Sequence, residues 1–198
     1  MSKVIPRYTC QMKNQDFLTN HFLVAMPTLD DPNFQQSVAF ICEHNDQGAL
    51  GIIINRPSNV VLGDIFDQLS IDAGSNESSK LPVWQGGPVQ LERGFVIHSP
   101  VGAWEATLKL APDLGVTSSR DVLDAIARGA GPEKLFVALG YAGWAAGQLE
   151  AELAENSWLS TPSDPHILFD LPVDQRWQAA AKSIGVDLNL LSGDAGHA

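Results

Sequence analysis

Cys42 and His44 are the most chemically suggestive pair in this sequence of 198 residues. They lie two positions apart in an apolar run, so on a β-strand both side chains would project from one face, with Cα atoms roughly 6.5–7 Å apart. A histidine beside a thiol favours the thiolate, which would make Cys42 a nucleophile or an oxidation-sensitive sulfur. The alternative is structural, with Cys42 as a small core residue and His44 as a polar residue at a strand end.

A metal site would need more ligands than this pair offers. His98, at the end of another expected strand, is a further candidate. A Cys-x-His fragment is weak evidence for zinc, because zinc sites take three or four protein ligands at recognisable spacings. We therefore expect neither a metal ion nor a cofactor.

Asn55 and Arg56 follow an apolar run and precede Pro57. The planar guanidinium of Arg56 could orient a carboxylate or phosphate group. Equally, it could bond to carbonyl groups at the end of the preceding strand. The sequence leaves these two roles open.

Two glycine-rich segments supply further candidate ligand-binding residues, which are Gly86, Gly87, Gly140, Gly143 and Gly147. Glycine allows the backbone to approach an anion closely, and a helix that follows such a loop can bind phosphate. However, no Lys or Arg lies between Lys134 and Arg176 to accompany a phosphate there. The alternative is that these glycines permit tight packing beside Trp144.

The elements that would position these residues alternate between short strands and short helices. Two apolar runs, 37–44 and 49–55, are joined by Asn-Asp-Gln-Gly and predict a hairpin that is covered on both faces. Apolar residues at helical spacing predict a helix over 62–69, and capping residues favour another over 119–128. Further strands are expected at 21–26, 83–89, 94–99, 104–110, 134–141 and 167–170, a helix at 148–155, and a final helix capped by Asp170. This arrangement predicts a mixed α+β fold in one domain.

Net charge limits the classes of partner. Twelve basic and twenty-three acidic residues give a formal charge of −11, which argues against nucleic acid and against anionic membranes. The acids of the expected helix at 148–155, Glu150, Glu152 and Glu155, predict a solvated helix face. Two cysteines cannot form a disulfide framework, no secretory signal is recognisable, and no apolar run approaches the ~20 residues of a membrane helix. We expect a cytoplasmic protein.

Four segments, FLVAMPTLDDPNFQQSV, ICEHNDQGALGIIINRP, VWQGGPVQLERGFVIHS and LGYAGWAAGQLEAELAENSWL, resemble the AlgH/YqgE family of bacterial proteins. The resemblance covers roughly residues 20–190. It implies an α+β fold with a bifurcated mixed sheet that forms a pseudo-barrel flanked by short helices. Residues 20–198 would form this domain, and residues 1–19 a peripheral or poorly ordered extension. Members are often labelled transcriptional regulators, and the family offers no established catalytic residues to carry over.

Three hypotheses of function follow. The first is a regulatory or binding protein that acts through a protein or small-molecule partner, which leans away from an enzyme. The second is a thiol-based enzyme or redox sensor that uses Cys42 with His44. The third is a DNA-binding regulator, which the net charge disfavours. We adopt the first; the sequence leaves the partner and the oligomeric state open.

Overall fold

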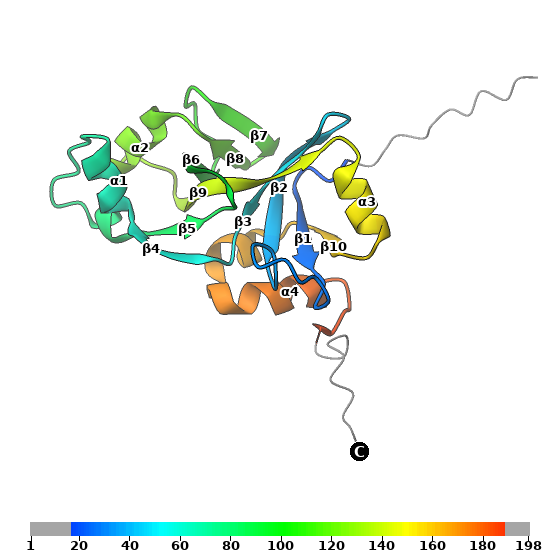
Figure 1. The fold of residues 1–198 in the computed structure, drawn as a ribbon. Coiled ribbons are helices and arrows are strands. Elements are labelled where there is room, and N and C mark those ends of the chain that lie inside the picture. Colours follow the sequence, from blue (N-terminus) through cyan, green and yellow to red (C-terminus); the bar gives the residue numbers. More distant parts are fainter. Residues whose placement is uncertain (1–16, 189–198) are drawn as a thin grey trace, which may run out of the picture.

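A ten-stranded sheet that divides into two arms organises the protein, whose computed structural model describes residues 17–188 (Figure 1). The strands are β1 (His21–Ala25), β2 (Val38–Asn45), β3 (Gly48–Ile53), β4 (Pro57–Val61), β5 (Pro82–Gln85), β6 (Val89–Ser99), β7 (Thr107–Ala111), β8 (Leu114–Thr117), β9 (Lys134–Ala145) and β10 (Trp158–Pro162). The helices are α1 (Leu62–Gln68), α2 (Arg120–Ala127), α3 (Gln148–Ala154) and α4 (Arg176–Lys182). Single turns of 3-10 helix span Glu77–Lys80 and Val173–Gln175, and a π-helix spans His166–Asp170.

The long strand β9 belongs to both arms. Its second half pairs with β3 and completes the first arm, in the order β10-β1-β2-β3-β9, in which all pairs are antiparallel. Its first half pairs with β6 on one side and, in parallel, with β5 on the other. With β4, β8 and β7 these strands form the second arm. The structure thus has the mixed, bifurcated sheet that the family resemblance implied.

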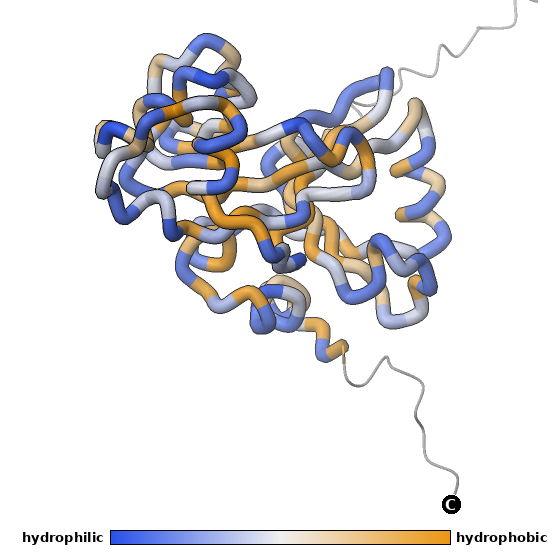
Figure 2. The backbone as a smooth tube through the Cα atoms, turned by 60° about the vertical axis from the view of Figure 1, so that its left-hand side comes forward, coloured by the Kyte–Doolittle hydropathy of each residue, from blue (hydrophilic) through white to orange (hydrophobic). Residues whose placement is uncertain are grey.

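Three hydrophobic cores fill the spaces around this sheet. The central core lies between the two arms and is closed by the C-terminal helical segment, including α4. The α3 core lies on the outer face of the first arm, and the α1/α2 core lies on the outer face of the second. Figure 1 shows α3 and the α1–α2 pair at opposite ends of the molecule. The strands in the middle are mostly hydrophobic, whereas the outer turns are hydrophilic (Figure 2).

Strand β2 shows how the sequence produces this arrangement. Phe40 and Cys42 enter the central core, whereas Ala39 and Ile41 enter the α3 core. Because consecutive side chains of a strand point to opposite faces, an unbroken apolar run supplies both cores at once. The hairpin predicted from the two apolar runs is confirmed, and so are the helices predicted at 62–69, 119–128 and 148–155.

Two predictions for the C-terminal part are wrong. The segment 167–170 is not a strand, because Ile167 and Leu168 enter the central core from a π-helical turn. The final helix begins at Arg176 rather than after Asp170, since a 3-10 turn intervenes. A short apolar run cannot by itself distinguish a strand from one buried helical turn.

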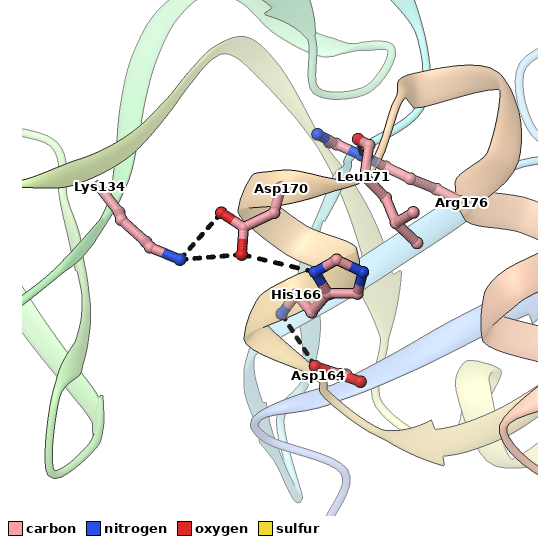
Figure 3. A network of polar contacts seen from close by, with 6 residues as sticks. All are labelled: Lys134, Asp164, His166, Asp170, Leu171 and Arg176. Carbon is pink, nitrogen blue, oxygen red and sulfur yellow. Dashed lines mark hydrogen bonds and ion pairs between the residues drawn. The ribbon is translucent and has the colours of Figure 1, made fainter.

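Polar contacts attach this C-terminal segment to β9, through Lys134 and Asp170 (Figure 3), and to the residue that follows β3. The ammonium group of Lys134 donates to both carboxylate oxygens of Asp170, each at 2.8 Å, and these bonds hold the pKa of Asp170 below its usual range. Arg176 is buried, and it donates from Nε to the carbonyl of Leu171 at 3.1 Å and from Nη1 to that of Ile54 at 2.6 Å. Burial lowers the pKa of Arg176 to about 10. This guanidinium also lies 5.3 Å from the ring centroid of Phe136, so it combines hydrogen bonds with a cation–π contact.

No helix among the described residues has the length and apolar character needed to cross a bilayer.

Candidate functional site

Cys42 is sealed inside the central core. It is 2% exposed, and its Sγ lies 3.7 Å from the carbonyl oxygen of Phe40. Burial raises the pKa of the Cys42 thiol, with a further contribution from the charge of Glu43. Both effects oppose formation of the thiolate that nucleophilic or redox chemistry requires.

His44 does not share a face with Cys42, contrary to the expectation from their spacing. A β-bulge between Ile41 and Glu43 makes Cys42 an extra residue in the β2–β3 ladder and breaks the alternation. The side chain of His44 therefore reaches α3, where Nε2 donates to Oε1 of Glu150 at 3.1 Å. Its other ring nitrogen, Nδ1, accepts the amide hydrogen of Leu18 at 2.9 Å. With both nitrogens engaged, His44 is not placed to act as a base for Cys42.

The contact with Leu18 also bears on the expected N-terminal extension, 1–19. Most of that range lies outside the described residues. The ring of Phe17 meets His44 edge to face at 5.3 Å, and the hydroxyl of Thr19 accepts the His44 amide hydrogen. Residues 17–19 are therefore attached to the β2–β3 hairpin.

Acidic residues of α3 serve the fold rather than forming only a solvated face. Oε2 of Glu152 accepts hydrogen bonds from the indole nitrogens of Trp144 and Trp158, both at 2.8 Å. Oε1 of Glu152 accepts another from the side chain of Gln148. Buried indole N–H groups require such acceptors, which explains why a carboxylate stands on this helix.

His98 is fully buried. Its Nδ1 donates to the carbonyl of Pro100 at 3.1 Å, and its Nε2 accepts from the hydroxyl of Thr117 at 2.8 Å. Burial lowers the pKa of His98. Within residues 17–188, no group of three or more His, Cys, Asp or Glu residues could hold a metal ion.

The sheet forks where β9 passes from the second arm to the first. Three of the candidate glycines lie together at this fork, and we call Gly86, Gly87 and Gly140 the fork glycines. The amide of Gly86 donates to Leu139 at 2.7 Å and its carbonyl accepts from Ile53 at 2.7 Å, so Gly86 joins both arms. A Cβ atom on Gly86 or Gly87 would collide with the backbone of β9. At Gly140, φ is +74°, and a Cβ atom would lie 2.5 Å from the carbonyl oxygen of Gly87. Glycine is therefore required here by close packing between chain segments.

The remaining candidates lie elsewhere or act structurally. Gly147 precedes α3 with φ of +75°, a conformation that favours glycine, and Gly143 is exposed on β9. The side chain of Asn55 accepts from the amide of Val38 and donates to the carbonyl of Gln36, each at 2.8 Å. Asn55 therefore fixes the start of β2 instead of facing a ligand.

Arg56 lines a small polar cavity beside the fork, which we call the Arg56 pocket. It has a volume of about 80 Å³ and is lined by Pro32, Asn33, Ile53, Arg56, Gln85, Gly87 and Pro88. Two candidates from the sequence, Arg56 and Gly87, thus meet in one cavity. The guanidinium also donates from Nη2 to the carbonyl of Gln35 at 3.0 Å, so both roles considered for Arg56 are compatible with its position.

A larger cavity lies between α1 and α2 on the outer face of the second arm, and we call it the α1/α2 groove. Its volume is about 270 Å³. Its lining is mostly apolar, with polar groups of Gln68, Glu92, Ser118, Ser119 and Arg120 among the residues around it. The apolar residues are Ile65, Leu69, Phe95, Val96, Leu123, Val137 and Leu139.

Sequence reasoning missed this groove, although α1 contained one signal of it. The apolar face predicted for 62–69 has four members, of which Leu62 and Phe66 are fully buried. The other two, Ile65 and Leu69, remain partly exposed and form one wall of the groove. The apolar face of α1 is wider than the part of it that the core covers, so some apolar surface remains exposed.

The model of a family described as AlgH-like matches residues 22–189. The chain belongs to the AlgH-like family. A UPF0301 protein of Thioalkalivibrio sulfidiphilus is 57% identical over 180 residues, which cover 91% of this chain and 96% of that protein. One from Stutzerimonas stutzeri is 58% identical over 183 residues, 92% of this chain and 96% of that protein.

Solved structures of similar proteins agree with the fold. The solution structure of the AlgH protein from Pseudomonas aeruginosa is 50% identical, with a TM-score of 0.77 over 95% of this chain and all of that one. A crystal structure of a protein from Corynebacterium diphtheriae is 20% identical, with a TM-score of 0.70 over 91% of this chain and 94% of that chain. The second likeness supports the AlgH-like fold alone.

Proposed function

We propose that this AlgH-like protein is a cytoplasmic binding protein whose partner is a small, mostly apolar molecule held in the α1/α2 groove. The observation that carries the proposal is the groove itself, a cavity of about 270 Å³ with an apolar floor and a polar rim. Ligand sites of small molecules are typically concave and apolar, with a few polar groups that fix orientation.

Strands form the floor of the groove, and helices form its sides. Val96, Val137 and Leu139 from the paired strands β6 and β9 supply a floor that the sheet holds rigid. Leu69 and Leu123 rise from opposite sides, and both are only half-buried. A ligand that filled the space between them would remove further apolar area from water, at about 25 cal/mol for each Å².

Charge on the rim favours a neutral ligand. Arg120 already forms an ion pair with Asp124 at 3.5 Å, and Glu92 lies among the residues around the cavity. Charges of both signs flank the groove, so neither cationic nor anionic ligands gain a clear electrostatic advantage. With a net charge of −11 for the whole chain, the partner is not nucleic acid. Any regulatory role would act through the bound molecule.

Amide chemical-shift mapping with small neutral one-ring and two-ring compounds tests this proposal. We expect saturable shifts at residues that line the groove, and their loss in Leu123→Trp, which fills it. The matched control, Leu108→Trp, adds the same ring on exposed strand β7 and should leave binding unchanged. A second blocking variant, Leu69→Trp, covers the case in which Leu123→Trp fails to fold. Absence of binding, or equal binding by the blocked and control variants, would overturn the proposal.

A further inference from the structure

The Arg56 pocket is a second concave site, which shares no lining residue with the α1/α2 groove, and its chemistry is different. The polar side chains of its lining are the guanidinium of Arg56, which only donates hydrogen bonds, and the amides of Asn33 and Gln85, whose NH2 groups can also donate. Its volume of about 80 Å³ admits a single small group rather than a whole cofactor. The pocket therefore suits a compact, hydrogen-bond-accepting group.

The walls of the pocket are held in place by backbone hydrogen bonds. The amide of Gln85 donates to the carbonyl of Arg56 at 3.0 Å, which ties the start of β4 to the end of β5. The adjacent fork glycine, Gly87, is pressed against the backbone of Tyr141 and has no room for a side chain. A site with such fixed walls needs little reorganisation when it binds.

No carboxylate among residues 17–188 neutralises the charge of Arg56. Among the described residues, no carboxylate lies within ion-pair distance of its guanidinium, and its one hydrogen bond there is to the carbonyl of Gln35. The nearby Asp31 accepts the amide hydrogen of Asn33 at 2.8 Å, so one of its oxygens is occupied within its own loop. In a chain with a net charge of −11, a lined cavity around an arginine that has no carboxylate partner in the described part of the chain points to an external anion.

We propose that the Arg56 pocket binds an oxyanion, the carboxylate or phosphate group of a small molecule. The guanidinium of Arg56 supplies the charge, and the side-chain amides of Asn33 and Gln85 supply neutral donors. The bond to the Gln35 carbonyl fixes one nitrogen of the guanidinium and leaves its other N–H groups available to the ligand. This site is independent of the α1/α2 groove.

The test is amide chemical-shift titration with inorganic phosphate and with acetate, each against sodium chloride of equal ionic strength. We expect saturable shifts at residues 33, 56 and 85 with one or both oxyanions. The two oxyanion arms identify which group the site prefers. Arg56→Gln should weaken this binding at least tenfold, whereas Arg128→Gln, which removes an exposed arginine from the end of α2, should leave it unchanged.

Because Arg56→Gln also removes the bond to Gln35, Gln85→Ala provides a second variant that keeps the charge. We expect it to weaken binding by a smaller factor. Equal shifts with chloride, equal binding by Arg56→Gln and Arg128→Gln, or no saturable shift with either oxyanion would overturn the proposal.

Discussion

The two outer faces of the sheet are covered in different ways. On the first arm, α3 packs with Trp144, Trp158 and the loop residue Phe34, whose rings contact one another at centroid distances of 5.7–6.3 Å. On the second arm, α1 and α2 cover the strands mainly with aliphatic side chains and leave the α1/α2 groove between them. Large aromatic rings fill a face that a single short helix could not cover, whereas two helices set apart by their strands leave a space.

This contrast shows that the pair with the most reactive side chains, Cys42 and His44, lies away from the α1/α2 groove. His44 lies on the closed α3 side and Cys42 in the central core, and both are nearly inaccessible. The open groove contains no residue that sequence motifs would select. Cys42 and His44 therefore pointed to the sealed part of the molecule, whereas the α1/α2 groove is lined mostly by aliphatic residues that belong to no motif.

The largest expected effect concerns access to Cys42. In a Cys10→Ser background, we expect the native protein to react with iodoacetamide at pH 8 at least ~1,000-fold more slowly than in denaturant, because burial excludes the reagent and disfavours the thiolate. Mass spectrometry over a time course gives both rates. A native rate within tenfold of the denatured rate would show that the central core opens, and would restore the thiol hypothesis.

A matched pair of leucines compares the two outer faces directly. Leu149 on α3 is 1% exposed, whereas Leu69 is half-buried beside the groove. We expect Leu149→Ala to lower the free energy of unfolding by about 3–4 kcal/mol and Leu69→Ala by only about 1 kcal/mol. The second change removes atoms from a wall that already borders empty space. Urea denaturation measures both, and equal losses would contradict the contrast between the faces.

Replacement of Arg176 tests how the C-terminal segment closes the central core. Arg176→Ala would leave the carbonyls of Ile54 and Leu171 without this donor and remove the cation–π contact with Phe136. We expect the free energy of unfolding to fall by about 2–3 kcal/mol. The control is Arg128→Ala on the surface, for which the loss should stay within about 0.5 kcal/mol. A similar small loss for both variants in urea would show that the C-terminal segment does not depend on this guanidinium.

The smallest expected effect is a change in the pH dependence of stability when His98 is replaced. Because burial lowers its pKa in the folded protein, the unfolded chain takes up a proton first as pH falls below about 6.5. The free energy of unfolding should then decrease, with a slope from this group of at most about 1.4 kcal/mol per pH unit. His98→Gln should remove that part of the slope between pH 7 and 5, and His21→Gln should retain it. An unchanged slope in His98→Gln would show that His98 protonates as readily in the folded state as in the unfolded chain.

Local patterns in the sequence predicted most of the helices and many of the strands, but not β4, β8 and β10. The hairpin of β2 and β3 follows from two apolar runs and a turn sequence, and helix α2 was predicted from the capping residues at its two ends. The bifurcated topology came from the family resemblance, since nothing in the periodicity of β9 shows that its two halves pair with different strands. The expected strand at 104–110 begins only at Thr107, because Trp104 turns to pack against His98 at 4.7 Å.

The candidate sites were predicted less well, for two physical reasons. One inserted residue, the bulge at Cys42, reversed the side-chain direction of His44, and no residue type in the sequence marks that bulge. Asn33 and Gln85 join Arg56 through contacts between segments that are distant in sequence. Such meetings depend on the packing of the arms, which local spacing does not encode.

The pairing of β1 with β10 has a consequence for synthesis of the chain. His21 lies opposite Pro162, and the indole of Trp177 donates to the carbonyl of Ala25 at 2.9 Å. The chain must therefore leave the ribosome as far as Pro162 before β1 gains its second neighbour. Until then β1 presents an unpaired apolar edge, so nascent molecules of this protein should depend on chaperones that shield such edges.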